Sequence, residues 1–171
     1  MEATFNAVVS KFDDSIWGFH IKVPDQIYSA FAKEKIKRVL MHFDGSNPLH
    51  AGFMPEGDGK YFLMLSKDVM KKMQLALGQN VEVKIVKDTS KYGMPISEEM
   101  QELLELDPDG EELFHKLTPG KIRSLLHFVN KYKSSDTRIE KSVIILEHLK
   151  ANNGKLDWKM LHEAFKRGPM I

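Results

Sequence analysis

Four basic residues at the starts of two expected helices are the side chains in this sequence best placed for binding chemistry. Lys121 and Arg123 begin one helix, and Arg138 and Lys141 begin the next, because each pair follows residues that favour a helix N-terminus. The free backbone N–H groups of a first helical turn attract anions. These four cations and the two helix starts could therefore hold an anionic ligand.

The same cations also have a structural explanation. Positive charge at a helix N-terminus opposes the helix dipole and requires compensation. Residues 96–115 carry eight acids and no base, whereas twelve bases stand against five acids from residue 116 to the end. Ion pairs between acidic and basic helices would satisfy both segments. The sequence leaves an anion site and internal pairing open, and it favours internal pairing.

Other residue types give weaker indications of chemistry. Trp17 could stack on a ligand, although filling the core is the simpler role for its ring. His20 and His42 share the polar phase of two expected strands, but no third ligand is placed beside them, so we expect no metal site. The absence of cysteine excludes disulfides and thiolate nucleophiles. No phosphate-binding loop, nucleophile elbow or His-Glu-x-x-His motif occurs, and we expect neither a cofactor nor an assignable catalytic residue.

The elements that position these residues differ between the two halves of the chain. In the first half, apolar and polar residues alternate along six segments and predict β-strands, with turn signals between them and two short helices interposed. The expected strands are Thr4–Phe12, Trp17–Val23, Arg38–Phe43, Leu49–Met54, Lys60–Leu65 and Val81–Val86.

Part of this half repeats itself. Shifted by 42 residues, Phe19–Phe43 lies on Tyr61–Ile85 without a gap, and eight apolar positions coincide. Either the chain contains an internal duplication, or two strand–helix–strand units of equal length match by pattern alone. A duplication predicts a six-stranded barrel over residues 1–87 with approximate two-fold symmetry. Such a barrel closes its own edges, so the chain could be monomeric.

The second half is helical by pattern. Residues 88–95 are polar with Gly and Pro, which is typical of a linker. From residue 96 to residue 171, N-cap signals and apolar residues at helical spacing predict five helices. The expected fold class is therefore α+β: a β-barrel with two short helices, followed by an all-helical module.

Composition limits the classes of function. The 171 residues carry a formal net charge of +1, and residues 1–95 hold thirteen bases and eleven acids, so nucleic-acid binding is not favoured. The N-terminus lacks the pattern of a signal peptide, and no segment approaches the roughly 18 apolar residues that a membrane-spanning helix requires. We expect a cytoplasmic protein without membrane insertion.

The first half resembles the small barrel family called domain of unknown function 1905, over residues 3–87. The resemblance rests on Trp17, on Val23-Pro24, on the turn Pro55–Tyr61 and on the ending Leu77–Val83. It implies the double-split barrel of AbrB/MazE-type regulators, whose dimers consist of two strand–helix–strand chains. Here both halves would lie in one chain.

Residues 107–154 are similar to the C-terminal module of the YdeI/OmpD-associated family, also called bacteriocin-protection proteins. The matching segments are 114–123 and 136–141. Such proteins often carry a second base directly after the Thr-Arg unit, whereas this chain has Glu140 before Lys141, which would weaken an anion site there. Neither resemblance implies a catalytic activity, a cofactor or catalytic residues.

Together these observations predict a bacterial, cytosolic, non-enzymatic binding or stress-protection protein with an unidentified ligand or protein partner. Nucleic-acid binding is one alternative, by analogy with the AbrB fold, although fold transfers function poorly. An enzyme with an unrecognised site between barrel and helices is another. A deep pocket with convergent polar groups and a shifted pKa would favour the enzyme.

Overall fold

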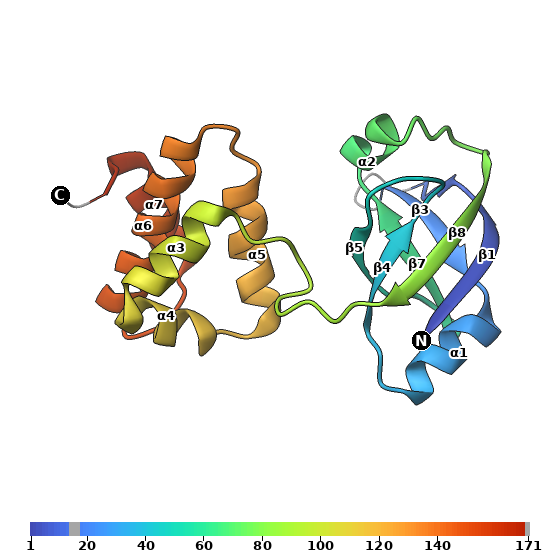
Figure 1. Ribbon diagram of the computed structural model, residues 1–171, viewed down its shortest axis with the longest axis horizontal. Coiled ribbons are helices and arrows are strands. Elements are labelled where there is room, and N and C mark those ends of the chain that lie inside the picture. The colour runs from blue at the N-terminus through green and yellow to red at the C-terminus, as the bar shows by residue number, and fades with distance from the viewer. Residues whose placement is uncertain (14–17, 170–171) are drawn as a thin grey trace. The chain divides into compact units, whose positions relative to one another are not determined.

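The computed structural model describes residues 1–13 and 18–169 and divides the chain into two compact units, Met1–Thr89 and Ser90–Ile171 (Figure 1). Within the described residues, the first unit contains two four-stranded antiparallel sheets, ordered β1-β8-β4-β5 and β2-β3-β7-β6. Its elements are β1 (Glu2–Val8), β2 (Ser10–Lys11), β3 (Phe19–Val23), α1 (Asp25–Lys33), β4 (Arg38–His42), β5 (Leu49–Gly52), β6 (Met54–Gly57), β7 (Lys60–Leu65), α2 (Lys67–Lys72) and β8 (Asn80–Lys87).

Two of the six expected strands are each divided in two, which gives eight strands among the described residues. The breaks fall at Val9 and Phe53, where the chain passes from one sheet into the other. The Val9 N–H donates to the Gln79 carbonyl at 2.8 Å, and the Phe53 N–H donates to the Lys37 carbonyl at 3.2 Å. The alternation of apolar residues runs up to Val9 and Phe53 without a turn signal at either bend, so the sequence pattern predicted one strand where the structure has two.

The strand order is symmetric. Exchanging β1 with β5, β2 with β6, β3 with β7 and β4 with β8 leaves the order of both sheets unchanged. The register shows the same relation, because Ile21 pairs with Leu63 and His42 pairs with Lys84, each residue facing its counterpart 42 positions later. This symmetry of order and register is what the predicted duplication would produce.

The ungapped match of the two copies fails at the helix ends. Helix α1 has nine residues and α2 has six. Both helices end with the same backbone hydrogen bond, from Ile36 to the Phe31 carbonyl at 3.0 Å and from Leu75 to the Met70 carbonyl at 2.9 Å. Met70 therefore takes the place of Phe31, so the expected shift of 42 residues, which places Phe31 on Met73, was wrong at this position. Helix α2 is three residues shorter than α1, and the loop before β8 is correspondingly longer than the loop before β4.

The core of the first unit lies between its sheets, where alternate residues of the strands are fully buried. Ile21, Val39, Leu63, Val83 and Ile85 are each 0% exposed. In β3 and β4 the residues between these core positions, His20 and His42 among them, consequently face away from the core. The described strands form two sheets rather than one continuous ring.

The second unit contains helices only. They are α3 (Glu98–Leu106), α4 (Pro108–His115), α5 (Pro119–Asn130), α6 (Ser135–Ala151) and α7 (Trp158–Arg167). Helix α6 is central: Ser142, Ile144, Ile145, Leu146, His148 and Leu149 are all buried, which covers most of its circumference. The described part of the chain contains no helix long and apolar enough to cross a bilayer.

The structure divides the expected linker, residues 88–95, between the two units. Asp88 accepts a hydrogen bond from His50 of the first unit at 2.7 Å, with its side chain 1% exposed. Tyr92 and Met94 pack on the helical core of the second unit, and the Tyr92 hydroxyl lies 2.9 Å from His115 Nε2. Each end of this segment therefore belongs to a folded unit.

Candidate functional site

Arg138, one of the four predicted anion-binding cations, is occupied by the protein itself. Its Nε and one Nη donate to the two carboxylate oxygens of Glu99 at 2.8 and 2.6 Å, and its other Nη donates to the carbonyls of Tyr132 and Lys133, both at 2.9 Å. This bidentate pair lowers the pKa of Glu99 to about 2. The basic start of α6 is thus joined to the acidic start of α3, as the internal-pairing explanation requires.

Of the other three predicted cations, one is paired within the described part of the protein and two are not. Lys141 pairs with Glu140 at 2.8 Å, reaches the Phe165 carbonyl at 3.3 Å and is 13% exposed. The side chains of Lys121 and Arg123 make no hydrogen bond or ion pair with any described residue. Trp17, the remaining candidate, lies outside the described residues. An anion site at Lys121 and Arg123 stays a prediction, whereas Arg138 and Lys141 are held by α3 and α7.

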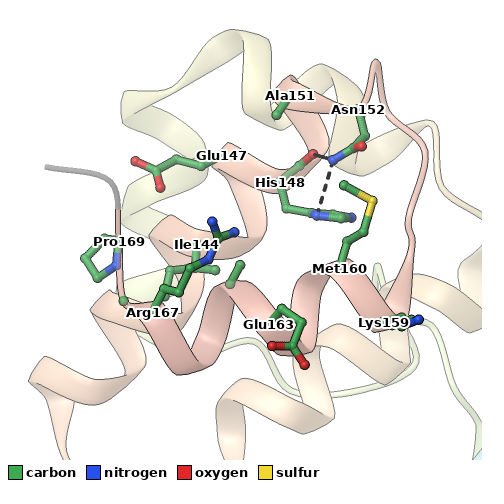
Figure 2. Close-up of a pocket in the computed structure, with 12 residues that line it drawn as sticks. Ile144, Glu147, His148, Ala151, Asn152, Lys159, Met160, Glu163, Arg167 and Pro169 are labelled. Atoms are coloured by element: carbon green, nitrogen blue, oxygen red, sulfur yellow. Dashed lines mark hydrogen bonds between the residues drawn. The ribbon is translucent and has the colours of Figure 1, made fainter.

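A groove between α6 and α7 is a second candidate, which the sequence did not suggest (Figure 2). Its volume is about 610 Å³, within the range of roughly 300–1,000 Å³ typical of small-molecule sites. One face of α6 and one face of α7 line it, together with the two residues that follow α7. The lining residues are Ile144, Glu147, His148, Ala151, Asn152, Lys159, Met160, Glu163, Ala164, Arg167, Gly168 and Pro169.

Helix periodicity accounts for this lining. The α6 contribution follows positions i, i+3, i+4, i+7 and i+8 from Ile144, which form a single stripe on a helix. Helix α7 begins where Asp157 caps it, with the Asp157 carboxylate accepting from the Met160 N–H at 3.0 Å. This cap fixes the point at which the α7 side chains begin to face α6. Met160 is 50% exposed, so its thioether is available at the edge of the groove.

His148 is the titratable group buried in the wall of the groove, with 7% exposure. Burial lowers the pKa of His148, and the nearby Asp157 carboxylate opposes that effect. The Asp157 backbone N–H donates to Nε2 at 3.2 Å, so Nε2 acts as the acceptor. The ring is therefore neutral at neutral pH, with its proton on Nδ1.

The proton on Nδ1 meets another donor. The Asn152 side-chain nitrogen lies 3.3 Å from His148 Nδ1 and donates to the His148 carbonyl at 2.8 Å (Figure 2). Turning the amide over would place its oxygen against that carbonyl, which is unfavourable. The Nδ1–H consequently has no acceptor among the described residues, although both side chains line the groove.

Some charged residues of the groove form ion pairs within the described part of the protein and others do not. Glu163 is paired with Lys166 at 3.0 Å, outside the lining set. Arg167 and Lys159 form no ion pair within the described part of the chain. Figure 2 shows Arg167 reaching from the end of α7 toward the turn of α6 that bears Ile144, whereas Lys159 and Glu163 point away from the middle of the groove. Arg167 is the cation positioned to meet a ligand.

Two histidines of the first unit also have notable environments. His20 is 2% exposed and stacks on Phe12 at a ring distance of 3.8 Å, and neither ring nitrogen makes a hydrogen bond of good geometry with a described residue. The His50–Asp88 pair joins β5 to the end of β8, with His50 19% exposed. No three His, Asp or Glu residues of the described chain are placed to hold a metal ion.

The sequence alone did not indicate the groove, and the reason is physical. His148 was one of several histidines on separate helices, without a second titratable residue at ligand spacing. Its position beside Met160 depends on how α7 folds back on α6, which is a tertiary contact. The polar members of the α6 stripe, Glu147, His148 and Asn152, were the available signal, because a helix that faces only core would carry apolar residues there.

Comparison with known proteins assigns both halves of the chain to families. Residues 5–85 match the family described as Domain of unknown function (DUF1905), and residues 94–152 match the family described as Bacteriocin-protection, YdeI or OmpD-Associated. Comparisons with curated proteins and with solved structures gave no match. The chain therefore joins a domain of the DUF1905 family to a domain of the bacteriocin-protection, YdeI or OmpD-associated family, in that order.

Proposed function

We propose that this protein is a non-enzymatic binding protein and that the groove between α6 and α7 holds its ligand. The observation that carries the proposal is the groove itself, with a volume of about 610 Å³ and a lining that includes the apolar residues Ile144, Ala151 and Ala164. His148, Asn152 and Arg167 add polar groups at its walls. An apolar site with few directed polar groups is the usual composition of a small-molecule pocket.

The state of His148 favours binding over catalysis at this groove. A general base needs a free lone pair within reach of the substrate. The lone pair on His148 Nε2 is already occupied by the Asp157 N–H at 3.2 Å, and Nδ1 carries the proton. His148 can donate a hydrogen bond to a ligand, but it is not arranged to accept a proton from one.

The family description supports a protective role. Residues 94–152, which include all of α6 but not α7, match a family described as Bacteriocin-protection, YdeI or OmpD-Associated. Sequestering a harmful compound needs a binding site and no reaction, which agrees with the groove. For the first unit we propose the pseudo-two-fold double-split barrel, a proposal supported by its symmetric strand order and by the Ile21–Leu63 and His42–Lys84 pairs.

Occupation of the groove can be tested on the full-length protein by NMR. Amide shifts would be followed during titration with three eight-carbon probes: octanoate, 1-octanol and octylamine. We expect at least one probe to shift amides of α6 and α7 selectively. Ala151→Trp should abolish the effect, because Ala151 is exposed, lines the groove and can be enlarged without disturbing the core.

A matched control separates blockage from a general effect of the added ring. Ala30→Trp places the same side chain at an exposed position on α1 of the first unit and should leave probe binding unchanged. Shifts scattered over both units, or identical titrations for Ala151→Trp and the unmodified protein, would refute the groove as the ligand site.

A further inference from the structure

We propose that the ligand class of the α6–α7 groove is an organic anion with an unbranched apolar body, of the kind represented by a medium-chain carboxylate. This inference rests on the proposed function and specifies the chemistry that the groove selects. Three features of the described residues support it: an unpaired guanidinium at one end, apolar residues along the lining, and a donor without an acceptor in the wall.

The lining carries two carboxylates, Glu147 and Glu163, and two cations, Lys159 and Arg167, and the position of Arg167 favours an anion at one end of the groove. Arg167 makes no hydrogen bond or ion pair within the described part of the chain, and its guanidinium reaches toward α6 (Figure 2). Glu163 is already paired with Lys166 and points away from the middle of the groove. A carboxylate can accept two parallel hydrogen bonds from a guanidinium, which gives both energy and orientation.

The spacing of the apolar lining residues favours an extended apolar chain. Ile144 and Ala151 lie about 10 Å apart along α6 at 1.5 Å per residue, with Glu147 and His148 between them on the lining face. Ala151 and Ala164 are small and leave room between the helices, and the Met160 thioether can adapt to the chain that passes it. An unbranched body can therefore follow the helix axis, with its carboxylate toward Arg167.

The wall offers a further donor. His148 Nδ1–H faces the Asn152 amide nitrogen at 3.3 Å instead of an acceptor. A buried donor without a partner is unfavourable, and an oxygen atom brought by a ligand would relieve it. The Arg167 guanidinium and the His148 N–H are both donors, and an acceptor-rich anion complements both.

The test compares affinities of octanoate, 1-octanol and octylamine for the full-length protein near neutral pH. The three probes share an apolar body and differ in the charge of the head group. We expect octanoate to bind about three- to tenfold more tightly than 1-octanol, the range for a charge-assisted hydrogen bond at a partly exposed site. Octylamine should bind most weakly.

Arg167→Gln should remove the preference for octanoate and leave the affinity for 1-octanol within twofold of the original. Lys155→Gln is the matched control: it removes the same charge from an exposed position between α6 and α7 that does not line the groove. It should change the octanoate affinity by less than twofold. Both residues are exposed, so neither change is expected to affect folding.

The outcomes separate this inference from the function on which it rests. Equal binding of the three probes in the groove would retain the binding site and overturn the anion preference. Tighter binding of octylamine would overturn it in favour of a cation held by Glu147 or Glu163. No groove-specific shift with any probe would overturn both proposals, while loss of the octanoate preference in Arg167→Gln alone would support both.

Discussion

Replacing His20 by Phe should stabilise the first unit, although it removes a polar side chain that the sequence placed on the polar face of a strand. The His20 ring is 2% exposed, stacks on Phe12 at 3.8 Å and lies edge-on to Phe62 at 5.4 Å. Among the described residues, neither of its ring nitrogens makes a hydrogen bond of good geometry. Phe62 is the residue 42 positions later, so the second copy already carries phenylalanine at the corresponding place.

The magnitude follows from the unsatisfied nitrogens. Leaving a buried donor or acceptor unpaired costs about 1–3 kcal/mol, and a phenyl ring of similar shape has no such group. The Gly18 carbonyl interacts favourably with the His20 ring and recovers part of the cost. We therefore expect His20→Phe to raise the free energy of unfolding of the first unit by about 1–2 kcal/mol.

The gain should depend on pH in a defined direction. Burial lowers the pKa of His20 from its ordinary value of 6.5, so the unfolded chain binds a proton at higher pH than the folded one. Stability is then lost as the pH falls below 6.5, by at most about 1.4 kcal/mol for each pH unit until the folded pKa is reached. The Phe variant lacks this loss. Its advantage over the unmodified protein should therefore increase on acidification.

Hydrogen exchange read on peptides of β3 and β7 during a urea titration would measure the first unit separately from the helical one. The control is His42→Phe, which alters a half-buried histidine on the outward face of the other sheet and should change stability by less than about 0.5 kcal/mol. A loss of stability in His20→Phe, or a gain that stays constant with pH, would show that the His20 nitrogens are satisfied and would refute the reasoning.

Two further predictions concern the helical unit. Glu99→Gln should weaken the junction of α3 with α6 at neutral pH. The pKa of Glu99 is lowered from 4.5 to about 2, so the contribution of the ionised carboxylate to stability is complete above pH 4.5 and is lost as the pH falls toward 2. Urea unfolding followed by helical circular dichroism should show the variant and the unmodified protein converging over that interval, and parallel curves would contradict it. Phe114→Ala should cost about 3–5 kcal/mol in the same assay, because Phe114 is 0% exposed, whereas a cost below about 1 kcal/mol would show that the core refills the space.

Local signals in the sequence predicted many helix boundaries because capping is a local interaction. Ser97, Asp107 and Thr118 each accept a hydrogen bond from the backbone N–H three residues later, at 3.3, 3.0 and 3.4 Å. For α6 the sequence predicts a start at Asp136 or Thr137, which is too late. Ser134 caps this helix instead, accepting from the Thr137 N–H at 3.4 Å.

Tertiary contacts set the limit of such reasoning. The sequence allows two roles for Arg138, anion binding and internal pairing. Only the tertiary structure, in which Glu99 lies 2.6 Å from its guanidinium, distinguishes them. The groove was beyond the sequence for the same reason, because nothing in the α6 stripe shows how closely α7 approaches it. The repeat was visible in the sequence, since strand pairing within a symmetric fold imposes the same apolar pattern on both copies.

The differences between the copies are as informative as their match. At a shift of 42 residues, His20 corresponds to Phe62 and Lys22 corresponds to Met64. Strands β2 and β6 are related by a shift of 44 residues, so Phe12 corresponds to Glu56. These substitutions fall on one outward sheet face, where Lys22 pairs with Glu56 at 2.7 Å.

Folding alone does not require this asymmetry, because phenylalanine serves at the position of Phe62 and the same ring would fit at His20. An unsatisfied buried histidine beside an ion pair is a cost that one copy carries and the other does not. The symmetric positions of the first unit account for its architecture. Any role of this unit separate from the groove is therefore best sought on the outward face of the β2-β3-β7-β6 sheet, starting with the binding properties of His20→Phe.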